Sequence, residues 1–408
     1  MWEQIKSNQV RSVMLIAIIA VLLLLVGYFL GLYFFQSGIG GLIIAFIIWA
    51  FMSLIAYFQG DSILLSLTKA RKIGPNDAPR LYNVVEEIKI ASGLEKMPNV
   101  YIIDDPALNA FATGRDPSKA SVAVTSGLLQ KLNRDELQGV IAHEIGHIKN
   151  RDVLLMAICS VMLGTIVILS WYASRFMLFG SMSGSGGRRS SSRDSGGGAA
   201  QVIVLVVGLV LMILAPIMAQ LIYYAVSRKR EYLADASSAL YTRYPEGLAS
   251  ALEKIGASTQ QLKSANQATA PMYIINPLHK EGMKASDLTS THPPISERVR
   301  ILRSMAGGAS LSDYENAYSQ VHTGKRVLSK AAVSGVEAVG IRAASISETG
   351  ELEPASEKAT RTREVSDMLL RINKFRTVDC ECGARWKVPP GFRDDSVLCT
   401  RCGRRIKV

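Results

Sequence analysis

Cysteine is scarce and unevenly placed in this chain of 408 residues. There are five cysteines, of which four lie in the last thirty residues while Cys159 stands alone in an apolar run. Secreted scaffolds held by disulfides carry cysteines throughout a short chain, so this distribution argues against that class and favours a reducing compartment. Cys159 has the surroundings of a small apolar filler.

Charge is absent from a long stretch near the N-terminus. No Asp, Glu, Lys or Arg occurs between Arg11 and Asp61, and the polar and glycine-rich residues 36–41 divide this stretch into two apolar runs. A bilayer core of roughly 30 Å needs about 20 helical residues, so residues 1–60 predict a transmembrane hairpin. A cleaved signal peptide has a shorter apolar core and a small-residue cleavage site, which the first run lacks.

Two further runs without charge predict two more transmembrane helices. They lie at 153–174 and near 201–226, within a membrane segment of 153–227. The Gly/Ser-rich residues 176–200 between them predict a loop that cannot bury a core. The net charge of +12 fits such a protein, because cytoplasmic loops of membrane proteins are enriched in Lys and Arg.

Basic residues flanking the predicted spans indicate how the chain is oriented. Lys and Arg follow the second span, precede the third and follow the fourth, all on the side of the N-terminus, which carries Lys6 and Arg11. The positive-inside rule makes that side cytoplasmic. Arg188, Arg189 and Arg193 in the predicted Gly/Ser loop oppose this assignment, so the orientation is favoured and not fixed.

The residues outside the spans combine helical and strand-like patterns. The elements expected in residues 61–152 are a helix at 81–94, strands at 99–104 and 121–127, and a helix that begins near Asn133 or Arg134. Residues 228–323 are expected to be largely helical.

One stretch of the last of these helices, His143-Glu144-Ile145-Gly146-His147, has the spacing of a zinc site. Positions i and i+4 share one helix face, so His143 and His147 can reach the same metal ion. Glu144 lies beside that face and can take a proton from water, and Gly146 leaves room near the metal. The pattern also arises by chance, as two partly buried histidines with ordinary hydrogen bonds.

A peptidase zinc needs a third protein ligand, and residues 227–236 (Ser-Arg-Lys-Arg-Glu-Tyr-Leu-Ala-Asp-Ala) offer candidates. Glu231 and Asp235 are again four positions apart on one helix face. Two predicted spans separate His147 from Glu231, and because this number is even, both residues lie on the same side of the membrane. The alternative for the two acidic residues is a solvated helix start beside basic residues.

Together with Asn-Ala-Phe-Ala-Thr-Gly at 109–114 and Thr-His-Pro-Pro-Ile-Ser-Glu-Arg-Val-Arg-Ile-Leu at 291–302, these motifs resemble the HtpX family. These are membrane zinc metalloproteases related to the CAAX prenyl proteases. The resemblance covers roughly residues 10–320. It implies a mainly α membrane protein, with four transmembrane helices and a zincin-like α+β catalytic domain made of residues 61–152 and 228–323.

The resemblance also implies roles for individual residues. His143, His147 and Glu231 would bind a catalytic zinc, and Glu144 would act as general base and then as proton donor. Asp235 matches the downstream acidic residue of the family, which we expect to orient a histidine ligand.

His292 and Arg298 match a His-Pro…Arg element of the family near the metal, where a cation or a hydrogen-bond donor can stabilise an oxyanion. The alternatives are a helix-start residue for His292 and a structural ion-pair partner for Arg298. Zinc peptidases often hold an extended substrate on an edge strand. Either the segment 109–114, with Asn109, Ala110 and Phe111 as candidate substrate contacts, or the strand at 121–125 could serve, and a packed turn under the catalytic helix is the alternative.

The end of the chain carries a second metal motif, outside the resemblance. A Cys-x-Cys-Gly and a Cys-x-x-Cys-Gly knuckle are separated by sixteen residues, and they predict a structural zinc in a zinc-ribbon-like module at 375–408. The four cysteines are Cys380, Cys382, Cys399 and Cys402. Rubredoxin-like iron and a redox dithiol pair are the alternatives. Residues 324–374 contain no aromatic residue before about Ala359 and predict a flexible linker.

The sequence therefore predicts a multi-pass zinc metalloendopeptidase of the inner (cytoplasmic) membrane, with its active site facing the cytoplasm. Expected partners are the lipid bilayer, protein or peptide substrates drawn from membrane or misfolded proteins in quality control, a protein or nucleic acid on the ribbon, and further copies of the chain. The alternative from another class is a non-catalytic membrane scaffold or receptor that binds a partner through the ribbon. A CAAX-type prenyl peptidase keeps the chemistry, but its relatives carry more membrane spans.

Overall fold

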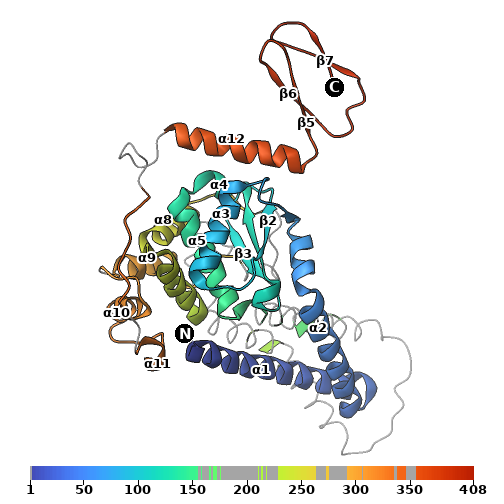
Figure 1. The fold of residues 1–408 in the computed structure, drawn as a ribbon. Helices are drawn as coiled ribbons and strands as arrows, with labels where there is room; N and C mark the ends of the chain where they lie inside the picture. Colours follow the sequence, from blue (N-terminus) through green and yellow to red (C-terminus); the bar gives the residue numbers. More distant parts are fainter. Residues whose placement is uncertain are drawn as a thin grey trace, which may run out of the picture.

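The computed structural model describes residues 2–154, 228–262, 292–305, 307–334, 338–345 and 355–408, with isolated residues between 158 and 217 and residues 273 and 274. Figure 1 shows an apolar helical hairpin, a central α/β body and a small C-terminal module beyond a long helix. Apart from isolated positions and residues 153 and 154, the predicted third and fourth spans lie outside the described residues, as does the Gly/Ser loop.

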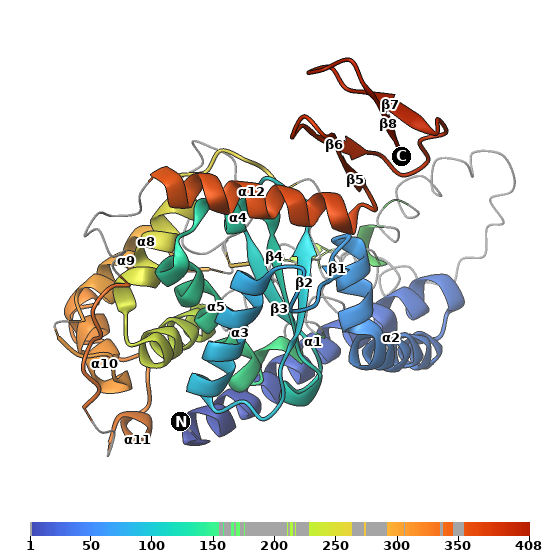
Figure 2. The same cartoon turned by 45° about the horizontal axis from the view of Figure 1, so that its top comes forward.

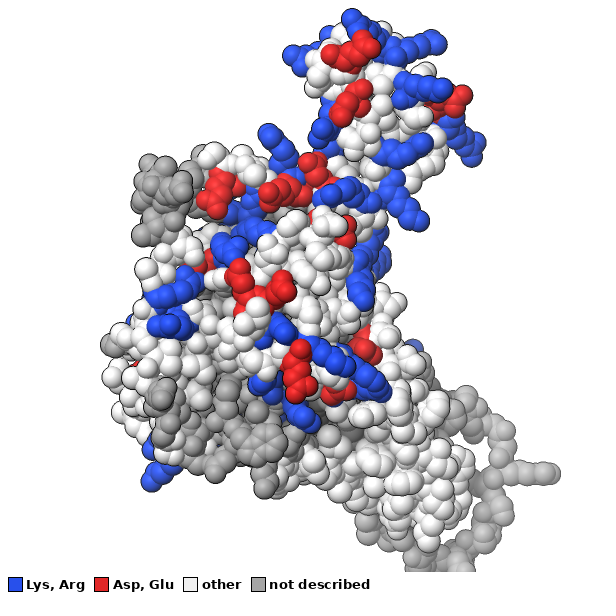
Figure 3. Space-filling view, viewed as in Figure 1, with Lys and Arg blue, Asp and Glu red and all other residues white. Residues whose placement is uncertain are grey.

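The hairpin consists of α1 (Trp2–Phe35) and α2 (Gly38–Leu67). Small residues let the two helices approach closely: a Cβ on Gly27 would lie 2.3 Å from the Cβ of Ala45, and a Cβ on Gly31 would lie 2.5 Å from the Cα of Gly41. Within the described part of the chain, α2 alone is long and apolar enough to cross a membrane, while α1 has a shorter apolar segment, Ile16–Leu32. On the face shown in Figure 3 the described side chains of the hairpin carry almost no charge.

The central body is built on a four-stranded sheet with strand order β1-β2-β4-β3 (Figure 2). Its strands are β1 (Arg71–Lys72), β2 (Asn99–Ile103), β3 (Ala110–Thr113) and β4 (Ser121–Thr125). β2 and β4 are parallel, and β3 pairs antiparallel with β4 at one edge of the sheet. The two predicted strands are therefore confirmed as β2 and β4, although residues 126 and 127 already belong to a helix, and the edge strand β3 is one of the two segments predicted to hold a substrate.

The helices of the body share one apolar core with this sheet. They are α3 (Pro79–Ser92), α4 (Ser126–Lys131), α5 (Arg134–Lys149), α8 (Pro245–Gly256), α9 (Ile295–Arg303), α10 (Leu311–Val321) and α11 (Lys330–Val333), together with helical residues 228–242. The start of α5 was predicted and is confirmed: Asn133 and Glu136 form a reciprocal capping box. α5 contacts β3, α3 and α8, so the predicted zinc motif lies in the middle of the body.

The segment predicted as a flexible linker, 324–374, differs from that prediction because it contains α12 (Ala355–Ile372). Val365 and Met368 of α12 are buried in the main core, and Arg361 Nε donates to the backbone oxygen of Gln130 at 2.8 Å. The lack of aromatic residues on which that prediction rested does not exclude an amphipathic helix. α12 crosses the end of the sheet in Figure 2 and leads to the C-terminal module.

The C-terminal module consists of two small antiparallel hairpins. β5 (Arg376–Asp379) pairs with β6 (Arg385–Val388), and β7 (Ser396–Leu398) pairs with β8 (Arg405–Lys407). Figure 1 shows the module on the side of the body opposite the hairpin of α1 and α2.

Candidate metal centre

The three predicted metal ligands meet at one point. α5 presents His143 and His147 on the same face, with their Nε2 atoms 3.2 Å apart. Glu231, from helix 228–242, faces both rings, with Oε2 3.6 Å from His143 Nε2 and Oε1 3.3 Å from His147 Nε2. The three ligand atoms lie within 4.8 Å of one another, and His143 and Glu231 are buried.

Gly146 allows the two ligand-bearing helices to approach closely. A Cβ on Gly146 would lie 3.1 Å from the Cβ of Ser237 and 3.4 Å from the Cα of Ala234, both on helix 228–242. The sequence prediction placed the free space of Gly146 near the metal. The structure places it instead at the helix crossing that brings Glu231 to the histidines.

A zinc ion fits the donor set of this site. Two imidazole nitrogens and one carboxylate are a known ligand combination of catalytic zinc in peptidases, with the fourth position left open. Within the part of the chain that the structure describes, the buried Glu231 Oε2 has no hydrogen-bond partner. The Nε2 lone pairs of His143 and His147 also face each other and need a cation between them. A metal ion would therefore satisfy both histidine nitrogens and the Glu231 carboxylate at once.

Carboxylates hold both histidine rings from behind. His143 Nδ1 lies 2.9 Å from Asp235 Oδ1, as predicted for Asp235, and His147 Nδ1 lies 3.3 Å from Asp152 Oδ2. A proton on each Nδ1 leaves each Nε2 lone pair free for a metal. The sequence reasoning missed Asp152; the available signal was an acidic residue close behind the zinc motif, directly before an apolar run.

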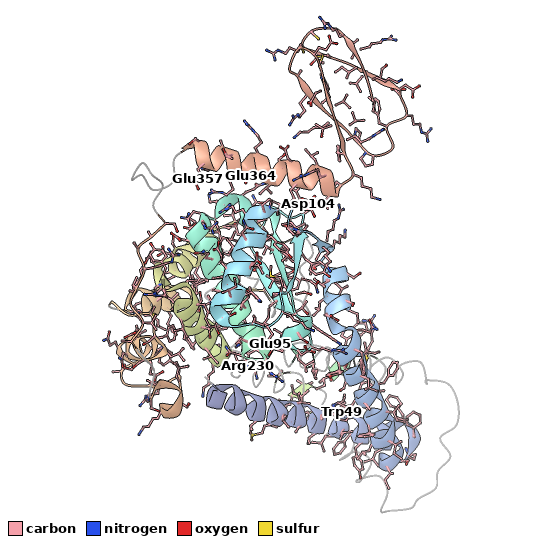
Figure 4. The ribbon with its side chains drawn as sticks, in the orientation of Figure 1. Trp49, Glu95, Asp104, Arg230, Glu357 and Glu364 are labelled. Carbon is pink, nitrogen blue, oxygen red and sulfur yellow. The ribbon has the colours of Figure 1, made fainter. Side chains whose placement is uncertain are left out.

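Arg230 extends the chain of contacts that runs from His147 through Asp152. Its guanidinium lies 3.4 Å from Asp152 Oδ1, and both side chains are buried. In Figure 4 Arg230 lies on the side of the body that faces the hairpin with Trp49, away from Glu357 and Glu364 on α12. The centre is therefore at the membrane-hairpin side of the body.

Arg298 of α9 is fully buried behind the ligands. It donates to both carboxylate oxygens of Asp235, from Nε at 2.8 Å and from a terminal nitrogen at 2.6 Å. The other terminal nitrogen lies 3.4 Å from Glu231 Oε2. The guanidinium is therefore engaged with the two acidic residues of helix 228–242, and its neighbour His292 lies with Nε2 3.7 Å from Glu231 Oε2.

Glu144 connects the ligand face to the edge strand. Its carboxylate is buried, and the backbone N–H of Ala112 in β3 acts to lower the pKa of Glu144 against the effect of burial. At the start of the strand the backbone oxygen of Ala110 accepts from Ile274 N at 3.0 Å. Phe111 is buried against the ring of Tyr273, at 5.2 Å between centroids, and Asn109 N donates to Thr125 Oγ1 at 3.0 Å.

The surrounding carboxylates favour positive charge at the two rings. Burial opposes ionisation of His147, but the hydrogen bonds to Asp152 and Glu231 raise its pKa to about 10. Burial likewise opposes ionisation of His143, and the hydrogen bonds to Asp235 and Glu231 still raise its pKa. The same environment that favours a proton on the rings favours a divalent cation between them.

The pKa values of Glu144 and His292 are shifted in opposite directions. Burial raises the pKa of Glu144. Burial also lowers the pKa of His292, to about 4, and the nearby Arg298 acts in the same direction against the attraction of Glu231. His292 is therefore a neutral imidazole at neutral pH.

The four predicted cysteine ligands also converge, in the C-terminal module. The Sγ atoms of Cys380 and Cys402 are 3.5 Å apart and those of Cys382 and Cys399 are 3.7 Å apart, too far for a disulfide. A tetrahedron with Zn–S bonds of about 2.3 Å has edges of about 3.8 Å, so the spacing fits zinc.

Each cysteine pair sits on a tight turn closed by a glycine. Gly383 N donates to the backbone oxygen of Cys380 and Gly403 N donates to that of Cys399, both at 2.8 Å. The φ angles are 80° at Gly383 and 73° at Gly403, in the left-handed region that favours glycine. The module is thus shaped as two knuckles around one point.

Comparison with known proteins gives three findings. The model of peptidase family M48 matches residues 75–306, a range that includes His143, Glu144, His147 and Glu231. Two relatives are each described as "Protease HtpX homolog". That of Dictyoglomus thermophilum is 46% identical over 314 residues, covering 77% of this chain and 98% of the relative. That of Streptococcus pneumoniae is 43% identical over 305 residues, covering 75% and 100%.

Among solved structures, the crystal structure of S. mikatae Ste24p is similar with a TM-score of 0.40 and 19% identity, covering 74% of this chain and 67% of that one. The C-terminal module at 375–408 lies outside the residues matched by the family model.

Proposed function

The chain belongs to peptidase family M48 and is a zinc metalloprotease of the HtpX type, and from this premise we propose its substrates and its site of action. It hydrolyses peptide bonds of membrane proteins and misfolded proteins on the cytoplasmic side of the inner membrane, in membrane-protein quality control. The observation that supports the proposal is the joint geometry of His143, His147, Glu231 and Glu144, close to an apolar hairpin.

Residue roles follow from this geometry. His143, His147 and Glu231 hold the zinc, which when bound polarises a substrate carbonyl and lowers the pKa of a water molecule. Glu144 takes the proton from water and returns it to the leaving amine. Its raised pKa suits both steps, because a carboxyl group that titrates closer to neutral pH is both a competent base and a competent acid.

His292 and Arg298 receive different roles in this proposal. His292 is neutral and lies beside Glu231, so it can donate a hydrogen bond to an oxyanion. Arg298 uses its guanidinium on Asp235 and Glu231. We assign it to positioning these two carboxylates, in place of the direct transition-state contact expected from the sequence.

The edge strand β3 binds the substrate through its backbone. Among the described strands it lies at the edge of the sheet and contacts α5, the helix of Glu144, and the edge of a sheet can add an extended peptide. Because Ile274 already pairs with Ala110, the peptide is placed along the part of the strand nearer Glu144. Asn109 and Phe111 are buried and hold the strand in place, so their side chains act from behind it.

The membrane arrangement completes the proposal. Four transmembrane helices anchor the chain, and the third begins only a few residues after His147, so the zinc stands close to the membrane surface. The apolar α2 and the nearly uncharged face of the hairpin support insertion. A second, structural zinc occupies the four cysteines of the ribbon, whose partner is a protein or a nucleic acid.

The test uses the full-length protein purified in detergent, with zinc per chain and cleavage of unfolded casein as readouts. Glu144→Gln should keep two zinc ions and lose cleavage by about 10²–10⁴-fold. Glu95→Gln changes an exposed glutamate in the same way and should cleave like the wild type. Equal cleavage by Glu144→Gln and the wild type would sink the assignment of Glu144. Zinc-loaded protein that cleaves nothing would favour the scaffold or receptor alternative.

A further inference from the structure

A segment outside the family match packs along the catalytic body. Residues 338–345, here named the strap, follow α11 and lie beyond the matched residues 75–306. The strap is held by backbone contacts: Ala309 N donates to the oxygen of Val339 at 2.7 Å, and Arg342 N donates to the oxygen of Arg243 at 2.9 Å. Arg243 Nε in turn donates to the oxygen of Gly340 at 2.9 Å.

The side chain of Arg342 joins the ends of two helices. Its Nε donates to the backbone oxygen of Thr242, at the C-terminal end of helix 228–242, at 3.0 Å. One terminal nitrogen donates to Asp135 Oδ1 at 2.6 Å and to Gln138 Oε1 at 2.8 Å, both at the start of α5. The guanidinium also lies over the ring of Tyr244, 4.9 Å from its centroid.

The carboxylate of Asp135 is enclosed by the strap. Besides Arg342, Ser345 donates to it from its backbone N, at 2.8 Å to Oδ2, and from its hydroxyl, at 2.8 Å to Oδ1. Asp135 is buried at the N-terminal turn of α5, where its charge also suits the helix dipole. This buried carboxylate is therefore satisfied largely by residues that the family model does not include.

The two helices joined by Arg342 carry all three ligands of the catalytic zinc. His143 and His147 are on α5, and Glu231 is on helix 228–242. Ligand positions must be held within about 0.5 Å for a working site, so the relative placement of the two helices matters. We propose that Arg342 is a positioning residue of the zinc site, which makes the peptidase depend on its own C-terminal strap. This inference rests on the ligand assignments of the proposed function.

The alternative is that Arg342 only adds stability to the fold, and Arg80 provides a matched control. Arg80 also bridges two elements through backbone oxygens at a helix end, donating to Leu129 at 3.2 Å and to Leu132 at 2.7 Å. The elements it joins, α3 and α4, carry no ligand of the site. Arg342→Ala and Arg80→Ala should therefore lower Tm alike and differ only at the zinc site.

The experiment follows zinc release to a chelator from full-length protein in detergent, along with kcat, KM and Tm. The release phase that is missing in Glu231→Ala identifies the catalytic zinc. In Arg342→Ala this phase should be about tenfold faster and kcat about tenfold lower, with KM within about twofold. Arg80→Ala should match the wild type in release and in kcat.

The inference is overturned if Arg342→Ala releases catalytic zinc and turns over like Arg80→Ala. Should Arg342→Ala fail to fold, Arg342→Lys keeps the positive charge beside Asp135 but cannot keep all three contacts, and it should be intermediate in zinc release. A wild type that cleaves no substrate contradicts the proposed function alone, because zinc release still decides the role of the strap.

Discussion

The two candidate metal centres of this molecule are built in opposite ways. In the ribbon, Cys380 and Cys402 are 22 positions apart, and the backbone turns that present the four thiols belong to the same small module. In the catalytic centre, α5 supplies two ligands and helix 228–242 supplies the third, with the predicted third and fourth spans between them. One site is local and the other depends on the fold of the whole body.

This difference explains the polar groups found around each site. The ribbon needs little beyond its knuckles, because metal binding itself folds such a module. The catalytic ligands instead need a second layer of buried charges to hold separate helices in register, formed by Asp235, Asp152 and Arg298. The structure therefore predicts that a substitution in the ribbon unfolds only the ribbon, whereas a substitution around the catalytic ligands lowers the stability of the whole body.

The largest effect is expected from breaking the ribbon site. The double variant Cys380→Ser/Cys382→Ser removes two thiolates, and structural zinc sites supply roughly 10–16 kcal/mol of folding free energy in isolated peptides. The ribbon should lose its metal ion and unfold, which hydrogen exchange over residues 376–407 would measure. Casein cleavage should stay within about twofold of wild type. The reciprocal variant Glu231→Ala should lose the other zinc and keep the ribbon protected; loss of both metals in either variant contradicts the separation.

A smaller effect is expected from removing one buried charge of the catalytic layer. Arg298→Ala leaves Asp235 buried with one partner fewer, and breaking a buried pair in this way costs about 3–5 kcal/mol. Thermal unfolding in detergent should show a large loss in Tm together with weaker catalytic zinc binding. Arg385→Ala removes an arginine paired with Asp379 on the exposed surface of the ribbon and should leave Tm unchanged. If Arg298→Ala and Arg385→Ala lower Tm by the same amount, burial does not explain the contribution of Arg298 to stability.

Residue spacing was enough to predict the local parts of this structure. Patterns of nearby residues set the helix that carries His143 and His147, its cap at Asn133 and the two strands β2 and β4, and the structure agrees with them. The four cysteines are a similar case, because their spacing alone brings their sulfurs within reach of one point.

Spacing could not predict contacts between distant segments. Nothing near Asp135 in the sequence indicates Arg342, and the two meet only because the strap follows the body back to the start of α5. The same holds for α12. Val365 and Met368 have the spacing of one helix face, but this spacing alone does not show that the face packs against the core of the body. For Arg298 the sequence predicted the right location, but the choice between substrate contact and ion pair depends on the depth of burial.

The smallest effect concerns the charge that ties the strap to α5. Burial opposes ionisation of Asp135, but Arg342 and the two donors of Ser345 outweigh it and lower its pKa. A carboxyl group with a lowered folded-state pKa adds stability above its unfolded pKa, near 4, and this stability is lost as pH falls through the folded value. Asp135→Asn should therefore be less stable than the wild type at pH 7, by about 1 kcal/mol or a few degrees in Tm.

The pH dependence distinguishes this charge effect from a simple loss of packing. The gap in Tm between Asp135→Asn and the wild type should begin to narrow below about pH 4, the unfolded pKa, and should close as pH falls through the lowered pKa of the folded-state carboxyl group. Asp379→Asn, at the exposed ion pair of the ribbon, should follow the wild type at every pH. A gap for Asp135→Asn that stays constant from pH 7 to the acid end of the titration would mean that the carboxylate charge does not hold the strap. The charge of Asp135 belongs to the catalytic body and not to the ribbon knuckles. Protection of the knuckles from hydrogen exchange should therefore be the same in Asp135→Asn and the wild type, so that the effect of this one carboxylate is confined to the catalytic body.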